Sequence, residues 1–258
     1  MSAAVLLKVL IGFIVGTLVG LTGLGGAVLL LPLLIFGLGI PAVTAIGSDA
    51  LFNFITKIPT SAMHIKYGNV RWRVVMGLAT GSIPGSYLGA TLLQHMKQVY
   101  GPGVNDVVKM VIGVLLLIVP MLLLFQDKLQ KEAVLTGEVQ RPIWLIALIG
   151  LGAGFLVGMT SVGSGSIIML LLLLFCHFDP RHMVGTDIAH AVLLTGFTSL
   201  LHWKYGNIDT HLVGMLLIGS IPGGILGARL SSKVPVLWLR RMLCTVLFLT
   251  GIRMLIPV

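Results

Sequence analysis

Long apolar segments follow one another along almost the whole chain, from Ala3 to Val258, and no other feature restricts its fold as strongly. Each segment has about 17 to 25 residues, close to the ~20 that an α-helix needs to cross the hydrocarbon core of a bilayer. Of the 258 residues, 57% are hydrophobic and only 10% are charged, whereas soluble domains have about 25% charged residues. The sequence therefore predicts an all-α polytopic membrane protein with no separate soluble domain.

The composition gives no sign of a cofactor, a metal site or a nucleic-acid partner. Cys176 and Cys244 have neither a C-x-x-C spacing nor a histidine at ligand spacing, so they are interpreted as apolar thiols. The formal charge of +9 could suggest nucleic acid, but basic membrane proteins usually have their surplus cations in cytoplasmic loops. Lys8 is followed by no A-x-A-like cleavage site, which favours a retained N-terminal segment over a removed signal.

The chain also repeats itself at a constant offset of 138 residues. Residues 64–69 read His-Ile-Lys-Tyr-Gly-Asn, and residues 202–207 read His-Trp-Lys-Tyr-Gly-Asn. One offset that holds along the chain without a gap indicates a duplicated structure. The same offset relates 81–90 to 219–228, 47–49 to 185–187, and Gly20, Thr22 and Gly25 to Gly158, Thr160 and Gly163.

The duplication predicts two transmembrane repeats, at 1–126 and 142–258, joined by a polar cytoplasmic linker at 127–141. Each repeat has about five hydrophobic segments, and an odd number would invert the second repeat relative to the first. The parity is the same if the first two segments of a repeat form a re-entrant hairpin with a short helix, so both arrangements stay open. The segments lie near 3–22, 24–38, 42–63, 72–93, 107–125, 143–160, 162–178, 180–201, 210–230 and 236–257.

The distribution of Lys and Arg agrees with inverted-topology repeats. If the loop with Lys66, Arg71 and Arg73 lies on one side, alternation puts eleven of the 17 cations on that side and five on the other. Only Lys57 is then left within the membrane. Because cytoplasmic loops have an excess of cations, both termini are predicted to lie outside.

Two acidic residues, Asp49 and Asp187, are predicted to lie at membrane depth, and they are equivalent under the offset. A charge in lipid costs about 2.5 to 3.5 kcal/mol or more, so such acids normally face a bundle interior or a water-filled cavity. The carboxyls could tie helices together by hydrogen bonds, or they could bind a coupling proton or gate a transport path. His190, three residues after Asp187, could likewise be a helix–helix hydrogen bonder or a proton relay.

A polar stripe on the third segment adds a cation to this region. Asp49, Asn53 and Lys57 are spaced at i, i+4 and i+8, which places them on one face of a helix. Thr195 is the equivalent of Lys57, so the duplication is broken at the one intramembrane cation. We therefore associate Lys57 with an anionic substrate. It could instead snorkel to an interface or neutralise Asp49.

Glycine-rich breaks separate a long segment from a short one in each repeat. They read Thr-Gly-Leu-Gly-Gly at 22–26 and Thr-Ser-Val-Gly-Ser-Gly at 160–165. Glycine lets the chain turn or unwind there, and the exposed N-terminus of a short helix favours anions. Paired broken segments commonly mark the central site of a transporter. The alternative is close packing of small residues at helix crossings.

Two other duplicated motifs are left outside the predicted site. Each His-x-Lys-Tyr-Gly-Asn motif places a tyrosine, Tyr67 or Tyr205, near an interface, where anchoring and a turn suffice to explain it. The Gly-Ser-Ile-Pro-Gly runs at 81–85 and 219–223 lie inside segments. Because proline kinks a helix, a hinge is predicted there.

The order of these motifs resembles that of the TauE/SafE sulfite exporter family. The residues concerned are Gly-Leu-Gly-Gly-Ala-Val-Leu-Leu-Leu-Pro (23–32), Gly-Ser-Asp (47–49), His-x-Lys-Tyr-Gly-Asn and Gly-x-Ile-Pro-Gly-x-x-x-Gly-Ala, with their duplicates. The second break lacks the proline that Pro32 supplies, so its geometry is expected to differ. The resemblance covers essentially the whole chain. It implies ion-gradient-driven export of sulfite or an organosulfonate such as sulfoacetate across the cytoplasmic membrane of a prokaryote.

The predicted function is secondary transport of a small anion, with the lipid bilayer and a coupling proton or cation as further partners. A passive anion channel and a non-transporting membrane scaffold remain alternatives. An enzyme is not expected, because the chain has no G-x-S-x-G, H-E-x-x-H or Walker A sequence. The residues predicted to bind substrate are Thr22, Gly23, Gly25, Gly26, Ser48, Asn53, Lys57, Thr160, Ser161, Gly163, Ser164 and Thr186. Those predicted for proton coupling or gating are Asp49, Asp187 and His190.

Overall fold

The computed structural model describes residues 3–22, 27–136, 142–176, 180–230 and 236–256. In these ranges all regular structure is helical, which confirms the predicted class. Four stretches are long and apolar enough to cross a membrane: Trp72–Met121, Ile143–Thr160, His182–Lys204 and Thr210–Gly227. The helices are α1 (Ala3–Thr22), α2 (Ala27–Pro32), the π-helix η1 (Leu33–Gly37), α3 (Ala42–Lys66), α4 (Trp72–Tyr100), the 3-10 turn η2 (Gly101–Gly103), α5 (Val104–Thr136), α6 (Ile143–Thr160), α7 (Ser166–Phe175), α8 (Pro180–Lys204), α9 (Thr210–Leu230) and α10 (Val236–Leu255).

Each predicted apolar segment corresponds to helical structure, with two informative differences. Helix α5 continues to Thr136, well into the stretch predicted as a linker, because residues 126–133 are mostly good helix formers although they are polar. The two short segments also differ from each other. Helix α2 ends at Pro32 and continues as a π-helix, whereas α7 has Leu170 at the equivalent position and is a regular α-helix. Proline lacks the backbone N–H that continues the α-helical ladder.

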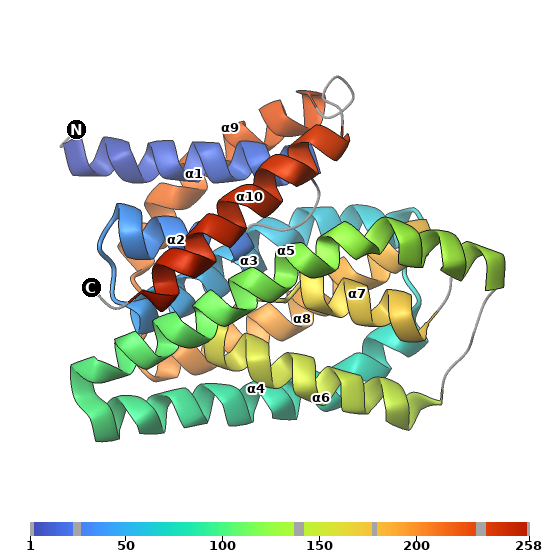
Figure 1. Ribbon diagram of the computed structural model, residues 1–258, viewed down its shortest axis with the longest axis horizontal. Helices are drawn as coiled ribbons and strands as arrows, with labels where there is room; N and C mark the ends of the chain where they lie inside the picture. Colours follow the sequence, from blue (N-terminus) through green and yellow to red (C-terminus); the bar gives the residue numbers. More distant parts are fainter. Residues whose placement is uncertain (1–2, 23–26, 137–141, 177–179, 231–235, 257–258) are drawn as a thin grey trace.

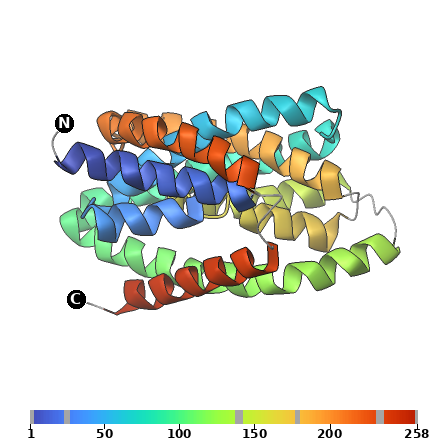
Figure 2. The ribbon, with the colours of Figure 1, turned by 90° about the horizontal axis from the view of Figure 1, so that it is seen from above.

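The short segments turn back inside the bundle. Helix α1 runs inward from the end with the N-terminus, and α2 with η1 returns toward that end; α6 and α7 enter and return from the opposite end (Figures 1 and 2). At 1.5 Å per residue, the ten residues of α7 are about 15 Å long, half of the ~30 Å hydrocarbon core. Helix α7 is therefore too short to cross a membrane, and the turn between α6 and α7 lies inside the bundle.

The helices pair in a pattern that repeats at the 138-residue offset. Helix α1 packs against α9, and the equivalent pair is α6 against α4. Helices α3 and α8 pack against each other in the centre, and α5 packs against α10 (Figure 1). Each of these pairs combines one helix from each half, so the two halves are interleaved.

Close packing in these pairs depends on glycine. Three glycines of α4 face α6, and a Cβ on any of them would collide with a backbone carbonyl of that helix. Three equivalent glycines of α9 face α1 in the same way. The Gly-Ser-Ile-Pro-Gly runs thus lie at helix crossings, where membrane bundles use small residues, and hinge motion there stays a prediction. The glycines are Gly81, Gly85 and Gly89 of α4 and Gly219, Gly223 and Gly227 of α9.

Replacing Gly154 with alanine is expected to lower the free energy of unfolding by about 1–3 kcal/mol, because its Cβ would collide with the backbone of Ser82 on α4. Gly152, on the same helix, has open space beside it and is exposed, so Gly152→Ala is the matched control. Thermal unfolding in detergent measures both variants. Equal midpoints would contradict the close contact between α4 and α6.

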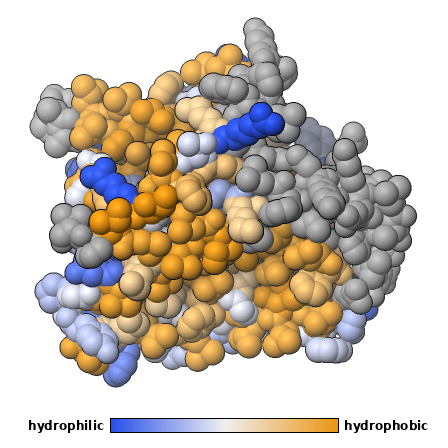
Figure 3. All heavy atoms as spheres, viewed as in Figure 1, coloured by the Kyte–Doolittle hydropathy of each residue, from blue (hydrophilic) through white to orange (hydrophobic). Residues whose placement is uncertain are grey.

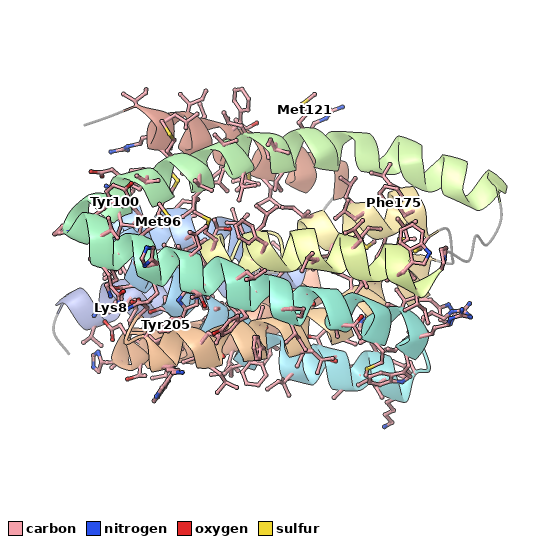
Figure 4. The ribbon with its side chains drawn as sticks, turned by 90° about the horizontal axis from the view of Figure 1, so that it is seen from below. Lys8, Met96, Tyr100, Met121, Phe175 and Tyr205 are labelled. Atoms are coloured by element: carbon pink, nitrogen blue, oxygen red, sulfur yellow. The ribbon has the colours of Figure 1, made fainter. Side chains whose placement is uncertain are left out.

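Equivalent turns lie at opposite ends of the molecule. Both termini lie at one end, and the end of α5 and the start of α6 lie at the other (Figures 1 and 2). The turn between α3 and α4 lies at the α5–α6 end (Figure 1). Tyr205, in the turn between α8 and α9, lies toward the same end as Lys8 and away from Phe175 (Figure 4).

The outer surface is apolar. Among the residues coloured in Figure 3, hydrophobic ones cover most of the visible surface and hydrophilic ones form small groups. Large side chains such as Leu200 and Trp144 are 70% and 68% exposed. Extensive exposed apolar surface is unusual in water and suits a lipid surround.

Candidate functional site

The polar stripe of α3 lies in the interior of the bundle. Asp49 and Asn53 are fully buried and Lys57 is 8% exposed. The Nδ2 of Asn53 donates to the backbone carbonyl of Asp49 at 2.9 Å, which fixes the amide against its own helix. The helical spacing therefore places a carboxyl, an amide and an ammonium along one buried face, as the sequence predicts.

The second break is a short turn between α6 and α7 that begins at Ser161. This residue has φ of 59° and is the one non-glycine residue with positive φ in the described ranges. An L-residue in such a conformation costs of order 1–3 kcal/mol, so the surrounding contacts must hold it there. One such contact is a 2.7 Å hydrogen bond that Ser161 Oγ donates to Asp49 Oδ2. The turn is thus tied to α3 through Asp49.

Lys57 reaches the same turn. Its Nζ donates to the carbonyl oxygen of Ser164 at 3.0 Å and lies 3.1 Å from Ser164 Oγ. Within the described part of the chain Lys57 forms no salt bridge, and Asp187 and Asp49 are the acids whose electrostatic influence reaches it. An ammonium has three N–H donors, so at least one is left for a ligand beside the start of α7.

Helix α8 contributes Asp187 and His190 from the other side. Asp187 is 6% exposed, and its charge interacts with that of Lys57. The Nε2 of His190 lies 2.7 Å from Ser82 Oγ, so α4 orients the imidazole. Asp49 and Lys57 of α3 thus contact the turn between α6 and α7, and α8 adds a second carboxyl, whose electrostatic influence reaches Lys57.

Several buried polar atoms in this region have no hydrogen-bond partner among the described residues. A buried polar atom without a partner costs about 1–3 kcal/mol, so such atoms usually meet water, an ion or a ligand. The described residues contain no group of three His, Cys, Asp or Glu placed to hold a metal ion. The atoms are Oδ1 of Asp49, Asn53 and Asp187, and Nδ1 of His190 and His202.

Ser48 and Thr186, both predicted to bind substrate, have protein partners. Ser48 Oγ accepts the backbone N–H of Asp209 at 3.0 Å, and Thr186 Oγ1 accepts the backbone N–H of Arg71 at 3.0 Å. Both side chains are fully buried. Each hydroxyl therefore holds a turn of the other half, and a role in substrate binding stays a prediction.

The other predicted residues lie at or beside the two breaks. Thr160 caps α6 by donating to a carbonyl of its own helix and accepting a backbone N–H two residues later. Gly163 and Ser164 are buried in the turn itself. Their roles in binding stay predictions. Thr22 ends α1, and its side chain, with Gly23, Gly25 and Gly26, lies outside the described residues.

Three buried contacts of this region were not predicted. They are Ser82 with His190, Ser86 Oγ at 2.7 Å from Thr198 Oγ1, and His202 Nε2 at 3.1 Å from a carbonyl in the last turn of α6. Ser82 and Ser86 are four residues apart and share one helix face, which is a signal that sequence reasoning could have used. No spacing of residues in the sequence predicts the contact between His202 and α6.

Replacing Ser161 with alanine is expected to destabilise the protein more than replacing it with glycine. Both changes remove the hydrogen bond to Asp49, but glycine adopts φ of 59° without strain, so the difference is about 1 kcal/mol. Thermal unfolding in detergent measures it. Ser199, whose hydroxyl bonds within α8, is the control position for loss of a buried hydroxyl. Equal midpoints for the two Ser161 variants would contradict the strain.

Comparison with known proteins gives the family. The model of the family described as "Sulfite exporter TauE/SafE" matches residues 8–254. The chain belongs to this family. "Probable membrane transporter protein YjnA" of Bacillus subtilis (strain 168) is 36% identical over 251 residues, which cover 96% of this chain and 98% of that protein. "Probable membrane transporter protein MJ0441" of Methanocaldococcus jannaschii is 25% identical over 265 residues, covering 97% and 95%.

The TauE/SafE match confirms the resemblance seen in the sequence. The family is described as a sulfite exporter family and its relatives are named as probable membrane transporters, so this chain is a membrane transporter of the TauE/SafE type. Its apolar helices agree with a multi-pass membrane protein. No solved structure matches the chain.

Proposed function

We propose that this TauE/SafE protein is a secondary transporter that exports a small sulfur-containing anion, such as sulfite or an organosulfonate, across the cytoplasmic membrane, coupled to an ion gradient. The observation that supports it most is the buried ammonium of Lys57 at the turn between α6 and α7. The family description supports the substrate class.

An anion would meet two sources of positive potential at this turn. One is the N–H of Lys57 that the protein leaves unused. The other is the start of α7, where the first backbone N–H groups and the positive end of the helix dipole follow Gly165 directly. A small oxyanion has enough acceptor oxygens to bond to both.

The two buried carboxyls give a physical reason for coupling. With Asp49 and Asp187 ionised and Lys57 charged, this group has a net charge of −1, and an entering anion would make it more negative. Excess charge of one sign is costly in a buried site. In that charge state, protonation of a carboxyl or entry of a cation would favour anion binding, which would link anion movement to a proton or cation gradient.

The proposal treats the halves as inverted repeats, with the cation-rich end in the cytoplasm and both termini outside. The distribution of Lys and Arg and the placement of equivalent turns at opposite ends of the bundle support this orientation (Figure 1). Movement of one repeat against the other would open the central site to each side in turn.

The test is uptake by the purified protein in liposomes. Sulfite, sulfoacetate, thiosulfate and sulfate are offered with and without an imposed pH or sodium gradient. Accumulation of one of these anions against its own gradient is the expected result and identifies the coupling ion. Equilibration that ignores both gradients would identify a passive channel. No flux in vesicles with verified insertion would contradict the substrate class and favour a scaffold.

A further inference from the structure

We infer that the two Lys-Tyr-Gly-Asn turns are the gates of the transport path, and that each is latched shut by an equivalent tripeptide of the other half. The inference rests on the proposed transport function and identifies its moving parts. The first gate is residues 67–71, between α3 and α4, and its latch is 185–187 on α8. The second gate is residues 205–209, between α8 and α9, and its latch is 47–49 on α3.

Both gates are compact turns with the same internal structure. In each, the backbone N–H of the asparagine donates back to the carbonyl of the histidine, at 3.0 Å in the first gate and 2.9 Å in the second. Gly68 and Gly206 have φ of 71° and 66°, a conformation that glycine adopts without strain. Each gate can therefore move as one preformed unit.

The second gate is seated on α3 by backbone contacts. Ser48 Oγ accepts the backbone N–H of Asp209 at 3.0 Å. Beside it, the carbonyl oxygen of Asn207 packs so closely on Gly47 that a Cβ there would collide with it. From α4, Lys97 Nζ donates to Asn207 Oδ1 at 2.6 Å. The gate is thus held by a hydroxyl and a glycine that adjoin Asp49.

The first gate is seated on α8 in the same way. Thr186 Oγ1 accepts the backbone N–H of Arg71 at 3.0 Å, and a Cβ at Gly185 would collide with the carbonyl oxygen of Asn69. The hydroxyl contact and the glycine contact each match their counterparts under the 138-residue offset, whereas the bond from Lys97 to Asn207 belongs to the second gate alone. In Gly-Ser-Asp and Gly-Thr-Asp, the glycine therefore packs against the backbone of the gate and the hydroxyl residue accepts its N–H. The aspartate is an acid of the central site.

Each latch lies inside the bundle. Ser48 and Thr186 are the seventh residues of α3 and α8, about 9 Å from the first residue of each helix. The second gate lies toward the end that includes Lys8, and the first lies at the opposite end (Figures 1 and 4). The two gates thus approach the central acids from opposite ends.

Both latches are formed in this structure, and the site is closed from both ends. Asp49 is fully buried, and Asp187 is 6% exposed. A transporter must open one end at a time. Because each gate is held by the other half, a movement between the halves that breaks one latch can keep the other.

The experiment compares Thr186→Val with Ser48→Ala in liposomes of determined orientation, by measuring the half-saturation concentration for the transported anion at each face. Thr186→Val is expected to lower this concentration up to about five-fold at the face of the first gate and not at the other face. Ser48→Ala is expected to do so only at the face of the second gate. About five-fold corresponds to the loss of one hydrogen bond worth about 1 kcal/mol.

Two control variants remove a hydroxyl whose bonds stay within its own helix, Thr56→Val on α3 and Ser199→Ala on α8. Neither control is expected to change the half-saturation concentration at one face and not at the other. Thr186→Ser keeps a hydroxyl at this position and is expected to have the wild-type half-saturation concentrations at both faces. Equal changes at both faces in the latch variants would overturn the inference.

Backbone amide hydrogen exchange tests the gates without any substrate, so it can show that the gate inference is wrong independently of whether the proposed transport function is wrong. Thr186→Val is expected to speed exchange at residues 67–71 alone, and Ser48→Ala at 205–209 alone. If the wild-type protein transports none of the anions, the proposed function fails while this measurement still tests the latches. Faster exchange at the wrong turn, or at neither, would overturn them.

Discussion

Replacement of Lys57 by methionine is expected to raise the half-saturation concentration for anion uptake by about ten- to hundred-fold. A hydrogen bond to a charged group is worth about 1.5–3 kcal/mol, and each 1.4 kcal/mol is a factor of ten. Methionine is flexible and apolar, so it can fill the space of the lysine side chain without adding a charge. Initial rates of uptake into liposomes, measured over a range of anion concentrations, give the value.

Two further variants show whether the rise in half-saturation concentration is caused by loss of the Lys57 ammonium. Lys57→Arg keeps the charge and is expected to retain more affinity than Lys57→Met. Lys109→Met removes a lysine whose partner, Asp106, is an exposed neighbour on α5, and such pairs contribute about 0–1 kcal/mol, so uptake is expected to stay at the wild-type level. A folded Lys57→Met protein with wild-type half-saturation would contradict a binding role for Lys57.

Much of the fold follows from the sequence because lipid and the helical period leave few choices. The apolar segments predict the helices, and the i, i+4, i+8 spacing of Asp49, Asn53 and Lys57 predicts the face that is buried. Helix α5 continues past the apolar segment at 107–125 to Thr136, because hydrophobicity marks where a helix leaves lipid and does not mark where the helix ends.

The partners of the site residues could not be predicted in the same way. Lys57 and Ser164 are 107 residues apart, and no local spacing connects them. Residues 81–86 show a second reason why the partners could not be predicted, because this one run contacts two helices. Its glycines pack on α6, while Ser82 and Ser86 bond to α8, so a pattern interpreted as a hinge also contains site contacts.

The duplication contains information that sequence reasoning used only in part. It predicts that whatever Ser48 contacts, Thr186 contacts the equivalent residue, and the structure bears this out at Asp209 and Arg71. It does not say what that contact is. Where the halves differ, as at Lys57 and Thr195, the equivalence gives no prediction of the contact.

Replacement of Asp187 by asparagine is expected to abolish gradient-driven accumulation while equilibration of the anion continues. The two acids are equivalent in sequence but not in their contacts. Oδ1 of both acids is buried without a partner among the described residues, but Oδ2 of Asp49 also accepts the hydrogen bond that holds the strained Ser161, whereas Asp187 lies within the electrostatic influence of Lys57. We therefore expect Asp187 to be the carboxyl that exchanges a proton or a cation during transport, with Lys57 and, three residues along the same helix, His190 as ionisable groups beside it.

The measured quantity is the accumulation ratio of the anion under an imposed gradient. One pH unit is worth about 1.36 kcal/mol per coupled proton, which corresponds to about ten-fold accumulation in the wild-type protein. Asparagine has nearly the size of aspartate but does not ionise, so Asp187→Asn is expected to give a ratio of about one. Asp49→Asn is the matched variant, because its amide oxygen can still accept the hydrogen bond of Ser161, and it is expected to keep coupling. Loss of coupling in Asp49→Asn but not in Asp187→Asn would contradict this assignment. The coupling carboxyl would then be Asp49, the one that also accepts the hydrogen bond of Ser161.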